Sequence, residues 1–147
     1  MGRALITHLF TQFSIEVNTE CQQEREINKM KIPNATQAVV DIEKLQGYCL
    51  NPDHPRGKHK ARLFASVLGL TAAEAEELRT MLLNIVRTHD AIATDHDQYG
   101  KRYVIEFSMA TKIGRAEVRS SWIIRQGEEF PRFTSCYVLK KGGDING

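Results

Sequence analysis

Residues 51–64 read NPDHPRGKHKARLF and join a turn to the start of a helix. Pro52 and Pro55 each restrict the residue before them to extended backbone, which favours a turn. From Lys58 onward apolar residues recur at helical spacing, and Gly69 is a typical residue to end the helix. The stretch therefore predicts a turn followed by an amphipathic helix, Lys58 to Leu68.

Basic side chains crowd the first turns of this expected helix. They are Arg56, Lys58, His59, Lys60 and Arg62. Cations at a helix N-terminus oppose the helix dipole, by about 0.3–1 kcal/mol each, so helix stability does not explain them. A fixed group of cations suits an anion such as phosphate, and the alternative is a solvated helix face that covers apolar neighbours. His59 and Arg62 share a helix face, whereas Lys60 is expected to point elsewhere.

Length and composition indicate one folded domain. The chain has 147 residues, of which 41% are hydrophobic, and its net charge of +2 does not by itself mark a nucleic-acid-binding protein. Residues 1–29 differ in pattern from the rest of the chain and are expected to be a loosely attached extension, with Met30 as the natural start. We expect a single domain over residues 30–140 and a flexible tail over residues 141–147.

The cysteine pattern indicates a reducing compartment. Cys21, Cys49 and Cys136 are odd in number and far apart, and no zinc-binding spacing is present. We interpret them as reduced thiols of a cytoplasmic protein. No run approaches the roughly 20 apolar residues of a membrane span, so no membrane partner is expected.

Two further helices are predicted around the turn. Asp41 is a suitable N-cap for a short helix from Ile42 to Leu50. Thr71 and Glu74 form a capping-box pattern at the start of a helix that runs to about Thr88. Its inward stripe is Ala75, Leu78, Leu82, Ile85 and Val86.

A polar segment, His89 to Gly100, separates the helices from the strands. It contains two histidines and three aspartates, and we expect it to be a loop. The spacing matches no metal-binding pattern, so neither a metal nor another cofactor is expected. The loop either flanks the functional site or is an inert surface loop.

The C-terminal part alternates with a period of two and predicts three strands, Arg102–Met109, Arg115–Arg125 and Arg132–Leu139. In the third strand Phe133 and Tyr137 are expected to face the same way. The fold class is α+β, with N-terminal helices followed by a three- to four-stranded antiparallel sheet (meander) and the helices packed on one face.

The other face of this sheet is expected to be open and polar. Its candidate side chains are Arg102, Glu106, Glu117, Arg119, Ser121, Arg132 and Thr134. Such a face is either a second part of the functional site or an ordinary solvated surface with cross-strand ion pairs.

Four motifs resemble a bacterial family of small uncharacterised domains. They lie at residues 44–64, Gly100–Tyr103, Gly114–Trp122 and Pro131–Tyr137, and the likeness covers roughly Lys31 to Leu139. Related sequences occur in phage-associated proteins, at the ends of toxin-like proteins and in toxin–antitoxin gene pairs. The resemblance implies a toxin whose partner is a cognate antitoxin protein.

In outline the chain also resembles the barnase, EndoU, colicin E5/D and RelE group of ribonucleases. These share N-terminal helices followed by an antiparallel sheet, as does the expected order here, which ends in the Thr134–Tyr137 strand. The likeness implies a metal-independent endoribonuclease that cleaves RNA phosphodiesters with the ribose 2′-OH as nucleophile.

Such a reaction needs a proton-transfer group, cations that hold the phosphate and groups that orient it. Histidine exchanges protons near neutral pH, which favours His59 for the first task. The expected catalytic residues are His59, Arg62, Arg119 and Thr134. The expected RNA- or phosphate-binding residues are Lys58, Lys60, Arg56, Ser121 and Tyr137.

The same residues fit a second class of function. A basic helix can dock a nucleic-acid backbone or an acidic protein without any chemistry. The alternative is therefore a non-catalytic nucleic-acid- or protein-binding module, such as an antitoxin- or immunity-like partner. The sequence leaves the choice between RNA cleavage and binding open, and also whether the chain is a monomer or a dimer.

Overall fold

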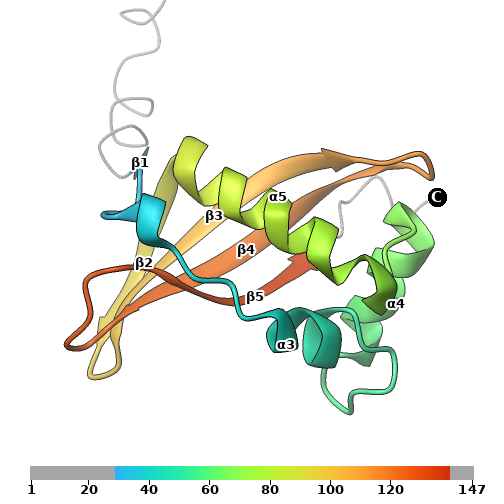
Figure 1. Ribbon diagram of the computed structural model, residues 1–147, viewed down its shortest axis with the longest axis horizontal. Coiled ribbons are helices and arrows are strands. Elements are labelled where there is room, and N and C mark those ends of the chain that lie inside the picture. The colour runs from blue at the N-terminus through green and yellow to red at the C-terminus, as the bar shows by residue number, and fades with distance from the viewer. Residues whose placement is uncertain (1–28, 140–147) are drawn as a thin grey trace, which may run out of the picture. The chain divides into compact units, whose positions relative to one another are not determined.

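The structure is a computed structural model, and its description covers residues 29–139 (Figure 1). The expected tail, residues 141–147, and all but the last residue of the expected extension, residues 1–29, lie outside that range. The helical segments are η1 (Ala35–Gln37), α3 (Ile42–Lys44), the π-helical η2 (Leu45–Cys49), α4 (Lys58–Leu68), η3 (Ala72–Glu74) and α5 (Ala75–Thr88).

The strands form one sheet in the order β1–β2–β3–β4–β5. Their bounds are β1 (Lys29–Met30), β2 (Ala91–Asp97), β3 (Gly100–Ala110), β4 (Arg115–Arg125) and β5 (Arg132–Val138). The consecutive pairs from β2 to β5 are all antiparallel. This confirms the α+β class with helices before an antiparallel meander, although within residues 29–139 the sheet has five strands rather than three or four.

The helix starts agree with the sequence signals. The Asp41 carboxylate accepts a hydrogen bond from the Glu43 backbone N–H at 3.0 Å. At the capping box, Thr71 Oγ1 accepts from the Ala73 N–H at 3.3 Å and Glu74 accepts from the Thr71 N–H at 2.8 Å. These bonds satisfy N–H groups that a helix leaves unpaired at its first turn.

One face of the sheet carries the core. Helix α5 crosses this face in front of β3 and β4 (Figure 1), and the five residues of its predicted inward stripe are all buried. The facing strand residues are Tyr103, Ile105, Phe107, Met109, Val118 and Trp122. Tyr103 and Trp122 are thus core residues. The buried Ser120 hydroxyl accepts from Trp122 Nε1 at 3.0 Å and donates to the Ile105 carbonyl at 2.9 Å.

The expectation of a loop between His89 and Gly100 is wrong. Residues 91–97 form β2, which pairs with β3 from Ile92 opposite Val104 to Asp97 opposite Gly100. Beyond Ala91 every residue of β2 is exposed, so the segment has no apolar alternation from which a strand could be predicted. Within residues 29–139 no group of three or more His, Cys, Asp or Glu side chains is arranged to hold a metal ion.

The expected facing of β5 is wrong in its second half. Trp122 pairs with Phe133, but the neighbouring Ser121 pairs with Ser135, so Thr134 is an extra residue in β5. Such a bulge reverses the alternation of the residues after it. Phe133 remains in the core, Cys136 and Val138 join it, and Tyr137 turns to the open face beside Arg119.

Two of the three cysteines lie within the described residues. Cys49 at the end of η2 and Cys136 in β5 are free thiols with no exposed surface. Burial raises the pKa of the Cys136 thiol well above its usual value, and the hydrogen bond from Cys136 lowers the pKa of Cys49. They form part of the contact between η2 and β5.

Among the helices of residues 29–139, none has the length and apolar character needed to cross a bilayer.

Candidate functional site

The turn before α4 is held by one imidazole. His54 Nδ1 accepts hydrogen bonds from the backbone N–H groups of Arg56 and Gly57, both at 3.0 Å. The ring also packs edge-on against Tyr48, with 4.7 Å between centroids. A Cβ on Gly57 would lie 2.8 Å from the Tyr48 carbonyl oxygen, so the close approach here requires glycine. These contacts assign His54 to the structure of the turn, and they fix where α4 begins.

Helix α4 and the end of β5 enclose a pocket. The two elements are in contact, and α4 lies beside the C-terminal end of β5 (Figure 1). The pocket has a volume of about 640 Å³ and is lined by His59, Lys60, Arg62, Leu63, Ser66, Tyr137 and Val138. Ala61, Phe64 and Leu68 on the other side of α4 are buried in the protein. The amphipathic pattern that builds the helix therefore turns His59, Lys60 and Arg62 toward this pocket.

Lys60 lines the pocket, contrary to the expectation that it points elsewhere. Its Nζ atom lies 4.7 Å from the centre of the Tyr137 ring, within the range of a cation–π contact. Lys60 is offset from His59 by about 100° around the helix, but its four-carbon stem can cover that offset. The length of the side chain, which helical spacing ignores, brings a third basic group to the pocket.

A row of polar side chains connects the pocket to the open face of the sheet. Glu106, Arg119 and Tyr137 are direct cross-strand neighbours on β3, β4 and β5. Arg119 donates through Nε to Glu106 at 2.8 Å and through a terminal nitrogen to the Tyr137 hydroxyl oxygen at 3.3 Å. The hydrogen bond to Glu106, and after it the one to Tyr137, raise the pKa of Arg119 above its usual value. Lys60 and Arg119 thus contact the same tyrosine from two sides.

The cations of the two surfaces differ in their partners. On the strands, Arg102, Arg119 and Arg132 each form an ion pair, with Asp97, Glu106 and Glu128 respectively. For Lys60 and Arg62, no carboxylate of the described residues lies within ion-pair distance. The strand arginines therefore fit the alternative of a solvated face with ion pairs. The charge that an anion could use lies on α4.

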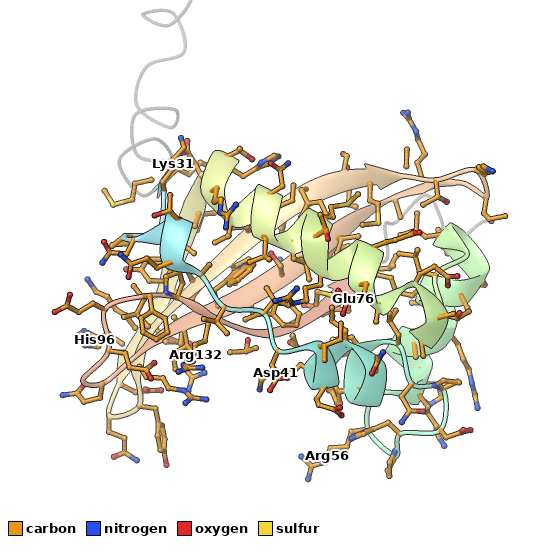
Figure 2. All side chains as sticks on the ribbon, viewed as in Figure 1. Lys31, Asp41, Arg56, Glu76, His96 and Arg132 are labelled. Atoms are coloured by element: carbon orange, nitrogen blue, oxygen red, sulfur yellow. The ribbon has the colours of Figure 1, made fainter. Side chains whose placement is uncertain are left out.

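The remaining predicted site residues lie outside the pocket lining. Arg56 is exposed on the turn and points away from the sheet (Figure 2). Lys58 is the first residue of α4 and Ser121 lies on the open face opposite Ser135. Thr134 is the extra residue of the β5 bulge. The structure brings together His59, Arg62, Lys60 and Tyr137, and it connects Arg119 to them through Tyr137.

Three lining residues of the pocket, Leu63, Ser66 and Val138, were not among the predicted site residues. Glu106 was expected on the open face, and the structure gives it the task of holding Arg119. The sequence does contain a signal for Glu106, because the short link between the two predicted strands, Thr111–Gly114, sets the register that places Glu106 opposite Arg119. Val138 could not be found, because the bulge that directs β5 has no signature in the sequence.

Fold and site together define a small α+β domain with a basic pocket beside an open, polar sheet face. The family model for a domain of unknown function, DUF6883, matches residues 31–140, and the chain belongs to that family. The expected membership of an uncharacterised family is thus confirmed. A search of the curated proteins gave no significant match. A search of the solved structures gave none either.

Proposed function

We propose that the chain is a metal-independent endoribonuclease and that the pocket between α4 and β5 is its active site. The observation that carries the proposal is the meeting of His59, Lys60 and Arg62 with Tyr137 around one cavity. A group able to exchange protons near neutral pH lies there beside two cations that have no carboxylate partner among the described residues. These are the groups that cleavage of a phosphodiester by the neighbouring 2′-OH requires.

The proposed reaction transfers one proton and exchanges one bond. His59 takes the proton of the 2′-OH while the 2′-oxygen attacks phosphorus, and the bond from phosphorus to the 5′-oxygen breaks. The same proton then returns to the leaving 5′-oxygen. The products are a 2′,3′-cyclic phosphate and a 5′-hydroxyl. Lys60 and Arg62 stabilise the extra negative charge on the phosphoryl oxygens, as preorganised donors do in other enzymes.

Tyr137 has a defined part in this scheme. Its oxygen accepts a hydrogen bond from Arg119, and its hydroxyl hydrogen has no acceptor among residues 29–139. The hydroxyl is therefore free to donate to a phosphoryl oxygen in the pocket. Arg119, itself held by Glu106, acts through Tyr137 and is a positioning residue.

The test is RNA cleavage in the presence of EDTA, with detection of 2′,3′-cyclic phosphate ends. We expect His59→Ala to lower the rate by about 10²–10⁴-fold, which is the usual contribution of an acid–base group. His96→Ala is the matched control and should leave the rate unchanged, because His96 is exposed on β2, at the other end of the sheet from α4 (Figure 2). Equal rates for wild type and His59→Ala would disprove the assignment.

The proposed biological role is that of a cytoplasmic toxin with a cognate antitoxin. It rests on the resemblance to toxin–antitoxin gene pairs and on the proposed chemistry. Expression in bacteria should arrest growth, and His59→Ala should relieve the arrest. Harmless expression of an active nuclease would contradict the toxin role. RNA binding that weakens with salt, without any cleavage, would instead support a non-catalytic binding module.

A further inference from the structure

The pocket has more apolar wall than a phosphate needs. The polar part comes from His59, Lys60, Arg62 and Ser66, while Leu63, Val138 and the ring of Tyr137 form the apolar part. A volume of about 640 Å³ lies within the usual range for sites that hold organic ligands. A ligand that fills the pocket therefore carries an apolar body close to its negative charge.

We infer that this apolar wall receives an unpaired nucleobase, so that the substrate class is single-stranded RNA. The inference rests on the proposed function, because it takes the phosphate to lie among His59, Lys60 and Arg62. A nucleotide joins a flat apolar base to a phosphate within a single residue, which matches the distribution of charge around the pocket. In a duplex both faces of a base are stacked, and the base has to leave the helix before it can enter such a site.

The contacts of Tyr137 support a fixed wall. The ring is held by Lys60 at 4.7 Å from its centre and by Arg119 at its hydroxyl. Leu63 projects from α4 between His59 and Lys60 in helical projection, and it is half-buried. A base placed here would contact Leu63 and Val138 while its phosphate stays within reach of the cations. In an acidic peptide, one side chain would have to supply the negative charge and a neighbouring side chain the apolar body.

The experiment measures binding without cleavage. RNA with 2′-O-methyl groups throughout lacks the attacking 2′-OH, so the strand stays intact. Fluorescence anisotropy at one fixed salt concentration would compare three ligands of equal length: the single strand, the same strand in a duplex, and an abasic single strand. We expect the single strand to bind about tenfold more tightly than the abasic strand, because loss of a base contact lowers affinity by a similar or larger factor in other proteins that bind single strands. The duplex should also bind more weakly.

A pair of leucine variants locates the effect. Leu63→Ala leaves every charge in place and should lower the affinity for the single strand toward that for the abasic strand. Leu83→Ala is the matched control, since Leu83 is equally half-buried but lies on α5. Thermal unfolding would show that both variants are folded. The comparison of the three ligands on wild-type protein tests the inference even if Leu63→Ala does not fold.

The outcomes separate this inference from the proposed function. Equal affinities for the single and abasic strands, or tighter binding of the duplex, would overturn the base site even if the nuclease assay succeeds. A base-dependent preference without any cleavage would support the site and refute the nuclease. If none of the three nucleic acids binds while an acidic, leucine-containing peptide does, the pocket takes a protein partner and the inference fails.

Discussion

Tyr137 is the residue on which the two parts of the site meet. Lys60 lies over its ring and Arg119 donates to its hydroxyl. Neither cation is near the other in sequence, and Tyr137 reaches both only because β5 changes its facing at Thr134. A single side chain thus joins the charges of α4 to the Glu106–Arg119 pair of the sheet.

Replacing only the hydroxyl tests this junction. Tyr137→Phe keeps the ring beneath Lys60 but removes the acceptor for Arg119 and the proposed donor to phosphate. We expect RNA cleavage to fall by about 100-fold, the lower range for loss of one preorganised donor. The free energy of unfolding, from urea titration, should change by less than about 1 kcal/mol because the hydroxyl lies outside the core.

The matched control is Tyr99→Phe, since Tyr99 is exposed in the turn after β2 and does not line the pocket. Both quantities should stay at their wild-type values in this variant. A Tyr137→Phe protein with full cleavage activity would remove Tyr137 and Arg119 from the proposed site.

Among the elements, α4 depends on the turn that precedes it. Gly57 has no room for a side chain, because a Cβ would lie 2.8 Å from the Tyr48 carbonyl oxygen. We expect Gly57→Ala to lower the free energy of unfolding by about 1–3 kcal/mol, as overpacked sites do. RNA cleavage should fall as well, because the first turn of α4 carries His59 and Lys60. Urea titration and the cleavage assay measure the two effects.

Gly47→Ala serves as the control for this change. The nearest atom to a Cβ at Gly47 is Glu43 Oε1 at 3.7 Å, which is an ordinary contact. The free energy of unfolding should stay unchanged or rise by as much as about 1 kcal/mol, which is the difference in helix propensity between glycine and alanine. Equal stabilities of the two variants would show that the turn tolerates a side chain.

The capping box at the start of η3 and α5 makes part of the stability depend on pH. The Thr71 backbone N–H, and after it the Thr71 hydroxyl, lower the pKa of Glu74 in the folded chain. A lowered pKa gives stability that is fully present above the ordinary glutamate pKa of about 4.3 and is lost as the pH falls through the folded value. Glu74→Ala should therefore be less stable than wild type at neutral pH, and the difference should shrink in acid.

Urea titrations of wild type and Glu74→Ala at neutral and acidic pH measure this difference. Glu77→Ala is the control, because the Glu77 carboxylate accepts no hydrogen bond from the other described residues. A Glu74→Ala deficit of the same size at both pH values would mean that the carboxylate charge contributes nothing to the cap.

The sequence predicted best where local signals agree. The capping box at Thr71 and the apolar stripe of α5 specify the same helix, and the alternation in β3 and β4 specifies the core face. It failed at β2, whose polar residues become a strand only through pairing with β3. It also failed in β5, where Thr134 interrupts the alternation. Both failures concern contacts between strands, which no local pattern contains.

The candidate site was predicted only in part, because some of its contacts likewise depend on the folded chain rather than on a local pattern. His59 and Arg62 are three residues apart, and helical geometry alone places them together. The approach of Lys60 to Tyr137 depends on side-chain length and on the bulge, and both are properties of the folded chain. Thr134, a predicted catalytic residue, takes no part in the pocket lining and instead sets the direction of Tyr137.

For the whole molecule, the family match begins at residue 31, one residue after Met30. We predict that deleting residues 1–29 leaves both the melting temperature and RNA cleavage close to those of the full chain. Circular dichroism during heating measures the first quantity, and the EDTA cleavage assay measures the second. A deletion variant that melts many degrees lower would show that the extension contributes to the folded core.

The extra residue in β5 has a consequence for how such domains diverge. In a regular strand a slip of one residue exchanges the side chains presented on the two sheet faces, and a bulge absorbs such a slip. A relative that lacks Thr134 would need no bulge, because Ser135 would follow Phe133 directly and Tyr137 would still lie opposite Arg119. The bulge thus lets this strand accept one additional residue without changing which side chains reach the open face.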